Sequence, residues 1–146
     1  MKIKETKSFG VIPVFKDEGG NFIFCLVKHA EGHWGFPKGG QEIGESEQET
    51  AIRELKEETG INDIKLFGNK SFTIKYLFKK DGLQYNKSVT YFPGFIFSMN
   101  TATPKDFKAE ISEIKWVSYK EAKELITFLE EKNILNQTFE YLNKPV

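Results

Sequence analysis

The chain carries a group of acidic residues whose spacing could hold a divalent cation. Glu54, Glu57 and Glu58 lie in a run bounded by Ser46 and Gly60. At about 100° per residue, a helix would place these three carboxylates within an arc of about 100°. Negative charges so close together repel unless a cation lies among them, and hard oxygen ligands suit Mg²⁺ or Mn²⁺. From this spacing alone, a solvent-exposed, glutamate-rich helix is the alternative interpretation.

The helix that these glutamates require is marked at both ends. Ser46 and Glu49 have the spacing of a capping box, and Gly60 follows the acidic run as a stop signal. The sequence therefore predicts a helix from Glu47 to Thr59. Within it lies Arg53, the single arginine among the 21 basic residues of the chain. A planar guanidinium can bind a carboxylate through two hydrogen bonds at once, which a lysine cannot do.

The loop before this helix extends the pattern into a long motif. Loop and helix together read Gly39-x5-Glu45-x7-Arg53-Glu54-Leu55-x-Glu57-Glu58-x-Gly60-Ile61. This motif resembles the Nudix box, the signature of hydrolases that cleave phosphoanhydride bonds with the help of Mg²⁺. The resemblance implies an α/β fold, an α/β/α sandwich with a mixed β-sheet between helices, in which residues 1–146 form a single domain.

The resemblance also implies a role for each position of the motif. Arg53 resembles the arginine that pairs with Glu45 and ties the loop to the helix, so both are expected to support catalysis. The cation would bind polyphosphate oxygens and lower the pKa of a bound water. The implied ligands of Mg²⁺, or of Mn²⁺ in its place, are the carboxylates of Glu54, Glu57 and Glu58 and the backbone carbonyl of Gly39.

Residues outside the motif resemble one subfamily, the asymmetrical bis(5′-nucleosyl)-tetraphosphatases, which hydrolyse diadenosine tetraphosphate. The segments that carry this resemblance are 32–40 (GHWGFPKGG), 89–92 (VTYF) and 110–116 (EISEIKW). It implies that Glu110 acts as a base or a metal ligand, with a solvated loop acid as the alternative. Aromatic faces suit a base and cationic groups suit phosphate, although such residues can equally be core or surface. The implied substrate contacts are His33, Lys38, Tyr76, Lys87 and Tyr91.

The expected activity is therefore Mg²⁺-dependent hydrolysis of diadenosine tetraphosphate to ATP and AMP. The Gly-Gly pair completed by Gly40 instead resembles that of the bacterial RNA pyrophosphohydrolases. The alternatives are therefore removal of pyrophosphate from RNA 5′ ends and hydrolysis of nucleoside triphosphates. A third alternative, a nucleotide-binding sensor module without catalysis, would lack part of the acidic set, which is complete here. A Walker A loop is excluded, because Glu45 stands where its lysine should follow Gly44.

Apolar runs predict the elements that position these residues. The capping box of Ser118 and Glu121 opens a second helix, whose apolar residues Ala122, Leu125, Ile126 and Leu129 have helical spacing. A short final helix is expected over 134–142. The segment 30–45, rich in glycine, is expected to be an irregular loop. The predicted strands are 8–15, 21–29, 64–67, 71–78, 87–98 and 113–118.

Composition and charge limit the classes of partner that this chain could bind. The chain has 146 residues, a formal net charge of zero and no basic block, which favours a small nucleotide substrate over a stable nucleic-acid partner or a membrane. No apolar segment follows the charged residues 1–7 as it would in a signal peptide. Cys25, the single cysteine, is expected to pack as a small buried residue. These features favour a cytoplasmic location, and the oligomeric state does not follow from the sequence.

Overall fold

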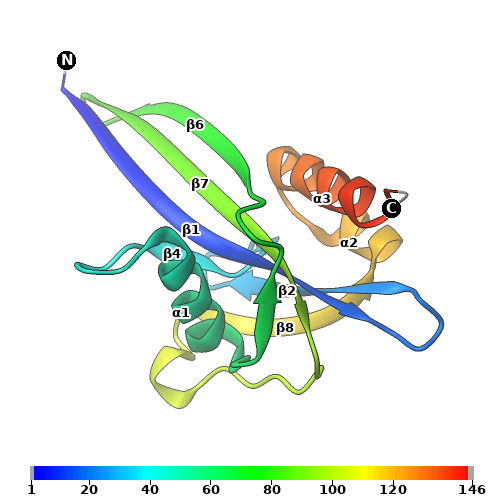
Figure 1. Ribbon diagram of the computed structural model, residues 1–146. Helices are drawn as coiled ribbons and strands as arrows, with labels where there is room; N and C mark the ends of the chain where they lie inside the picture. Colours follow the sequence, from blue (N-terminus) through cyan, green and yellow to red (C-terminus); the bar gives the residue numbers. More distant parts are fainter. Residues whose placement is uncertain (1, 145–146) are drawn as a thin grey trace.

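The computed structural model describes residues 2–144 (Figure 1). The strands are β1 (Ile3–Lys16), β2 (Phe22–His29), β3 (Trp34–Gly35), β4 (Lys38–Gly40), β5 (Ile64–Leu66), β6 (Phe72–Lys80), β7 (Leu83–Ile96) and β8 (Ile111–Ser118). The helices are α1 (Glu47–Thr59), the 3₁₀ turn η1 (Lys105–Phe107), α2 (Tyr119–Leu125) and α3 (Leu129–Leu142). No helix among these residues is long and apolar enough to cross a membrane.

The strands form a mixed sheet between helices, as the resemblance implied. Its strand order is β3-β2-β1-β7-β5, with β4 paired to β1, β6 to β7 and β8 to β2. β1 and β7 run parallel over most of their length, while the other pairs are antiparallel. Helix α1 lies against one face, and α2 and α3 lie against the other (Figure 1). The result is the expected α/β/α sandwich.

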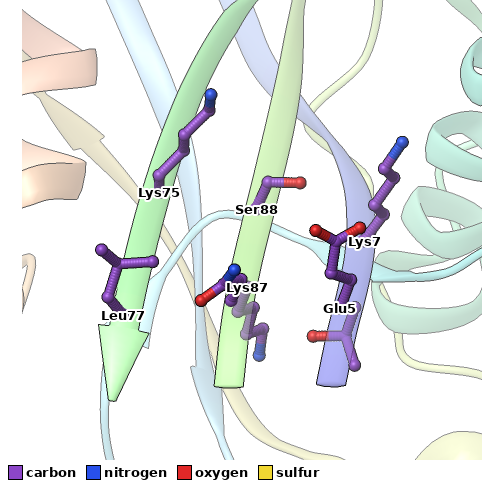
Figure 2. Close-up of a pocket in the computed structure, with 8 residues that line it drawn as sticks. Glu5, Lys7, Lys75, Leu77, Lys87 and Ser88 are labelled. Carbon is purple, nitrogen blue, oxygen red and sulfur yellow. The ribbon is translucent and has the colours of Figure 1, made fainter. Parts of the chain in front are cut away.

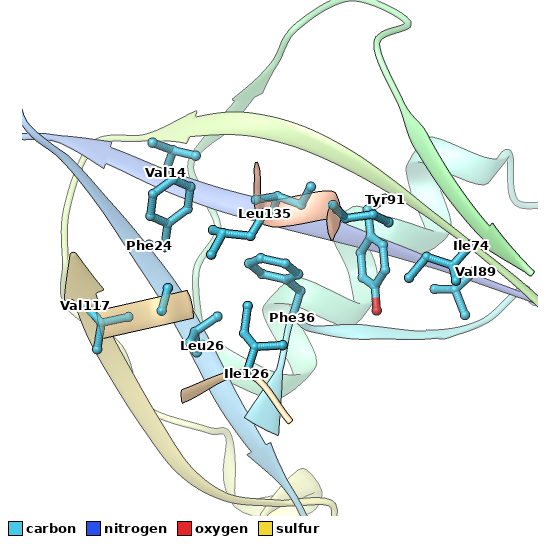
Figure 3. Close-up of a cluster of buried hydrophobic side chains, with 13 residues drawn as sticks. Val14, Phe24, Leu26, Phe36, Ile74, Val89, Tyr91, Val117, Ile126 and Leu135 are labelled. Atoms are coloured by element: carbon cyan, nitrogen blue, oxygen red, sulfur yellow. The ribbon is translucent and has the colours of Figure 1, made fainter. Parts of the chain in front are cut away.

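Each face of the sheet buries its own apolar layer. Alternate residues of a strand point to opposite faces, so neighbours on β1 divide between the two layers. The layer under α2 and α3 is built around Phe36, Tyr91 and Leu135, all completely buried (Figure 3). The layer under α1 contains Leu55 and also Cys25, which packs as a buried residue as expected. Burial raises the pKa of the Cys25 thiol far above its usual range.

Helix α1 has the predicted bounds, because its signals are local. The Ser46 side chain accepts from Glu49 N, and the Glu49 side chain accepts from Ser46 N, which completes the predicted capping box. Gly60 ends the helix with a φ of 78°, a left-handed conformation that favours glycine. Leu55 is completely buried against the sheet, and Glu54 and Glu58, on an adjacent part of the helix surface, are buried beside strand β4.

The prediction of one helix from Ser118 through Leu129 was wrong. Helix α2 ends at Leu125, and Ile126 has a ψ of 130°, which is not helical. The chain is held extended there because Thr127 N donates to Trp34 O (3.1 Å) and Trp34 N donates to Thr127 Oγ1 (2.8 Å). A new helix, α3, begins at Leu129, five residues before the predicted final helix. Tertiary hydrogen bonds therefore override the local helical spacing.

The segment 30–45 contains two short strands where an irregular loop was expected. Strand β4 pairs with β1 through Lys38 and Gly10 and through Gly39 and Phe9. A side chain at Gly10 would collide with the carbonyl of Pro37, so glycine is what allows β4 to lie against β1. This pairing fixes Gly39 and Lys38 beside the end of α1 that carries the glutamates.

Candidate active site

Arg53 joins the loop before α1 to the helix, as the motif predicted. Its Nε and Nη2 donate to the two carboxylate oxygens of Glu45, at 2.6 and 3.0 Å. Nη2 also donates to Gly40 O at 2.8 Å. Its guanidinium lowers the pKa of Glu45 to about 2, with the backbone hydrogen bond of Glu42 as the next cause. The predicted bidentate contact is confirmed.

The remaining nitrogen of Arg53 faces the helix glutamates. Nη1 donates to Glu54 Oε1 at 3.0 Å and to both carboxylate oxygens of Glu57, at 3.0 and 3.1 Å. The hydrogen bonds with Glu45, then those with Glu57, raise the pKa of Arg53 beyond its already high value. One guanidinium therefore neutralises part of an acidic cluster and fixes its orientation.

Glu54 and Glu58 form a close carboxylate pair under β4. Lys38 N donates to Glu58 Oε2 at 3.2 Å, and the Glu54 carboxylate occupies the space that a side chain at Gly39 would need. Burial and then the neighbouring Glu54 raise the pKa of Glu58, and burial also raises the pKa of Glu54. Because two such groups cannot both stay ionised without compensation, the pair is suited to a cation.

One oxygen of this pair has no partner. Glu58 Oε1 is buried without a hydrogen bond within the described part of the chain. Across residues 2–144, no three histidine, cysteine or acidic side chains already gather as a ready metal site, and Glu57 is turned toward Arg53. Buried, unpaired carboxylate oxygen is nevertheless the donor type that Mg²⁺ and Mn²⁺ prefer. The donor chemistry of Glu54 and Glu58 therefore fits such an ion.

A cavity of about 520 Å³ on the α3 face brings together four of the five predicted substrate contacts: His33, Lys38, Tyr76 and Lys87. Tyr76 and Lys87 are direct neighbours across β6 and β7. Lys38 connects this cavity to the glutamate pair, because its side chain lines the cavity while its backbone N–H binds Glu58. Because it gathers residues that the sequence predicted to contact a nucleotide, we call this cavity the nucleotide pocket. Its size is that of a small-molecule site.

The cationic groups of the nucleotide pocket crowd one another. Burial and then the adjacent Lys38 ammonium lower the pKa of Lys87. Burial and then Lys38 also lower the pKa of His33, whose ring stacks on His29 with centroids 4.5 Å apart. Like charges held this close destabilise the cationic forms unless an anion binds among them. These cationic groups are therefore suited to hold the anionic part of a ligand, while Glu31, Glu130 and Glu131 line the same pocket.

Two predicted site residues lie elsewhere. Tyr91 is completely buried, with its ring against Phe36 at a centroid distance of 5.7 Å, so it belongs to the core and does not line the pocket. Substrate contact by Tyr91 is therefore not supported. Glu110 is exposed just before β8, where its carbonyl accepts from Ala30 N at 2.9 Å. It is absent from the described lining of the nucleotide pocket.

Sequence reasoning missed several residues of the pocket lining, among them Phe128 and Glu131. The ring of Phe128 lies 5.2 Å from that of His33, centroid to centroid. Glu131 is 3% exposed, and its Oε2 accepts from Phe36 N at 3.3 Å. A signal for Glu131 was present, since it occupies the helical stripe that continues through Ile134. A lone acid on an apolar stripe indicates a special position.

A second cavity, of about 330 Å³, lies among β1, β6 and β7 (Figure 2). Lys7, Ser88 and Lys75 form one row across these strands, one residue from the row of Tyr76 and Lys87, so they face the opposite side of the sheet. Apart from Lys87, no predicted site residue lines this cavity. The chemistry of the motif therefore points to the nucleotide pocket.

Comparison with known proteins agrees with this geometry. A family model of the NUDIX domain matches residues 4–137. The asymmetrical bis(5′-nucleosyl)-tetraphosphatase of Mus musculus is 31% identical over 137 residues, which are 87% of this chain and 85% of that one. The RNA pyrophosphohydrolase of Nitratiruptor is 29% identical over 131 residues, 84% of this chain and 82% of its own.

Two further matches differ in coverage. MutT4 of Mycobacterium tuberculosis is 31% identical over 111 residues, which are 76% of this chain but 43% of that longer protein. The binary complex of a C. elegans Ap4A hydrolase superimposes with a TM-score of 0.79 and 25% identity, covering 94% of this chain and 97% of the other. Motif, fold and relatives agree, and the chain belongs to the Nudix family of hydrolases.

Proposed function

We propose that this Nudix hydrolase cleaves dinucleoside polyphosphates, with diadenosine tetraphosphate giving ATP and AMP. The observation that carries the proposal is the place of Lys38. Its backbone holds Glu58 of the acidic motif, while its side chain lies with Lys87 and His33 in the nucleotide pocket. A polyphosphate bound by these cationic groups would lie beside the glutamates that the reaction needs.

The metal would be Mg²⁺, or Mn²⁺ in its place, held by Glu54, Glu57 and Glu58 with the carbonyl of Gly39. When bound, it would supply positive charge to the phosphate oxygens and lower the pKa of the attacking water. The protein itself contributes Glu58 Oε1, which is buried and has no hydrogen-bond partner among residues 2–144. Arg53 positions the set, since it binds Glu54 and Glu57 through one nitrogen.

Different residues of the pocket would bind the phosphates and the base of the nucleotide. Lys38, Lys87 and His33 would hold phosphate oxygens, because each can donate charged hydrogen bonds. Tyr76 would stack on a base, since every base has a flat, uncharged face that can lie against an aromatic ring. Glu110 remains a candidate base or ligand, on its place in the sequence alone.

An RNA 5′ end is the second candidate substrate. Gly40 and the match to the Nitratiruptor RNA pyrophosphohydrolase favour it. A test is a panel of dinucleoside polyphosphates, nucleoside triphosphates and triphosphorylated RNA, each with Mg²⁺ and with products separated by chromatography. We expect the highest kcat/KM for diadenosine tetraphosphate. Faster release of pyrophosphate from RNA would establish the second candidate instead.

A further inference from the structure

Glu131 is a buried acid on a helical stripe that is otherwise used for packing. It lies in the first turn of α3, and the stripe continues through Ile134, Leu135 and Thr138, all buried. Those side chains contribute to the interior, whereas Glu131 forms part of the wall of the nucleotide pocket. Glu131 therefore belongs to the wall that a bound ligand would face.

The loop opposite α3 is shaped to receive this carboxylate. Phe36 N donates to Glu131 Oε2 at 3.3 Å. A side chain at Gly35 would collide with the same oxygen, so glycine leaves the space that the carboxylate fills. The position of Glu131 is thus fixed by two consecutive residues of strand β3 and its loop, and is not that of a freely moving surface acid.

The carboxylate has few partners for so buried a group. Among residues 2–144, no lysine or arginine lies within 4.0 Å of it. Burial raises the pKa of Glu131 to about 7, although the Phe36 hydrogen bond and then the Lys38 charge lower it. Burying an acid with so little compensation costs free energy. Such groups are concentrated at functional sites, where a ligand completes their contacts.

The negative charge of Glu131 indicates which part of a bound nucleotide would lie against it. Phosphate would be repelled by a carboxylate and attracted by Lys38 and Lys87, so an uncharged part must lie at Glu131. Tyr76 lines the same pocket, and burial and then the charge of Glu131 raise the pKa of the Tyr76 phenol to about 12. An aromatic face beside a hydrogen-bond acceptor suits the edge of a base.

We propose that Glu131 is a specificity-determining residue that accepts a hydrogen bond from the exocyclic amino group of an adenine bound against Tyr76. The inference rests on the proposed function, since it requires a nucleotide in this pocket. Adenine carries an amino group at C6, whereas hypoxanthine carries an oxygen there. That oxygen would face the carboxylate with no proton between them. The pocket should therefore prefer adenine to hypoxanthine.

The test is calorimetric binding of AMP and of IMP to the full-length protein at about pH 8, where Glu131 is ionised. We expect the wild type to bind AMP about 10- to 100-fold more tightly than IMP, as one hydrogen bond with a charged group allows. In Glu131→Gln the preference should fall below about threefold, because an amide can turn to donate to the hypoxanthine oxygen. Equal affinities in the wild type would overturn the inference.

A second variant moves the carboxylate without removing it. Gly35→Ala should displace Glu131 and reduce the preference for AMP, because the added methyl group occupies the space of Oε2. Glu140→Gln, on the exposed side of the same helix, is the matched control and should keep the wild-type preference. Thermal melts establish that each variant is folded. A folded Glu131→Gln protein with the wild-type preference would also overturn the inference.

The readout separates this inference from the proposed function. AMP and IMP are not cleaved, so their relative affinities can be measured whether or not the protein hydrolyses diadenosine tetraphosphate. Absence of that hydrolysis with a retained AMP preference would contradict the proposed function only. Hydrolysis of diadenosine tetraphosphate by a wild type with equal AMP and IMP affinities would contradict only the assignment of Glu131.

Discussion

Arg53 donates two parallel hydrogen bonds to Glu45, from Nε to Oε2 at 2.6 Å and from Nη2 to Oε1 at 3.0 Å. The same side chain reaches Glu57 and Glu54 through Nη1. Loop and helix are thus joined at one planar group, which no single ammonium can replace. The orientation of the acidic cluster should depend on the shape of this group as well as on its charge.

Arg53→Lys should accordingly keep the charge and lose activity. We expect kcat/KM for the preferred substrate to fall by about 10- to 100-fold, since a lysine cannot bind Glu45 and Glu57 together. The far-ultraviolet circular dichroism spectrum should be unchanged, because the packing of Leu55 is untouched. A lysine variant with the wild-type rate would mean that the positive charge alone suffices.

Glu57→Gln tests whether this carboxylate leaves Arg53 to bind the metal. The amide can still accept a hydrogen bond from Arg53, but it is a poor ligand for a divalent ion. We expect kcat to fall by about 100-fold or more, with partial recovery at high Mg²⁺. Glu47→Gln, at the start of the same helix, is the matched control and should stay near the wild-type rate. Wild-type turnover of Glu57→Gln at low Mg²⁺ would remove Glu57 from the ligand set.

Lys87 should act in binding more than in the chemical step. Lys87→Gln removes one of the two crowded ammonium groups, and we expect KM to rise by about 10-fold, the effect of one charged hydrogen bond. Lys75→Gln makes the same change on the opposite side of the sheet and should leave KM unchanged. Steady-state kinetics distinguishes the two. Equal effects of both variants would point to a general loss of positive charge.

Glu131 should make the protein less stable as the pH rises. Its folded-state pKa of about 7 lies above its ordinary value of 4.5, so the folded state holds the proton more tightly than the unfolded chain. Stability from this group is therefore full below about pH 4.5 and is lost as the pH rises through 7. Relative to Glu131→Gln, the wild type should lose up to about 3 kcal/mol between pH 5 and 8. Parallel urea titrations of both proteins give this difference, and a constant difference would contradict it.

The parts that the sequence could predict are those with local causes. The bounds of α1 follow from the Ser46 capping box and from Gly60, and the Arg53–Glu45 contact follows from the motif. The break between α2 and α3 has no such local cause, because the backbone of Trp34, nearly a hundred positions earlier, holds Thr127. Residue types along the chain carry no record of such a contact.

The depth to which each side chain is buried also could not be predicted from the sequence. Lys87 and Tyr91 lie on the same face of β7, since they are four residues apart, and strand alternation predicts only that shared face. The protein covers Tyr91 completely and leaves Lys87 half-buried at the pocket. The difference depends on where α3 crosses the sheet, which the sequence of β7 does not contain. The helical stripe marked Glu131 as a lone acid among apolar positions, but the contacts that bury it come from Gly35 and Phe36 of another segment.

The most direct test of the account is the identity of the products formed from diadenosine tetraphosphate with Mg²⁺ in ¹⁸O-labelled water. We predict ATP and AMP in equal amounts, with the heavy oxygen in only one of them, because water attacks one phosphorus near an end of the bridge held by Lys38 and Lys87. Mass spectrometry of the separated products reads both results. Formation of ADP alone, or no cleavage of diadenosine tetraphosphate beside rapid release of pyrophosphate from triphosphorylated RNA, would contradict it.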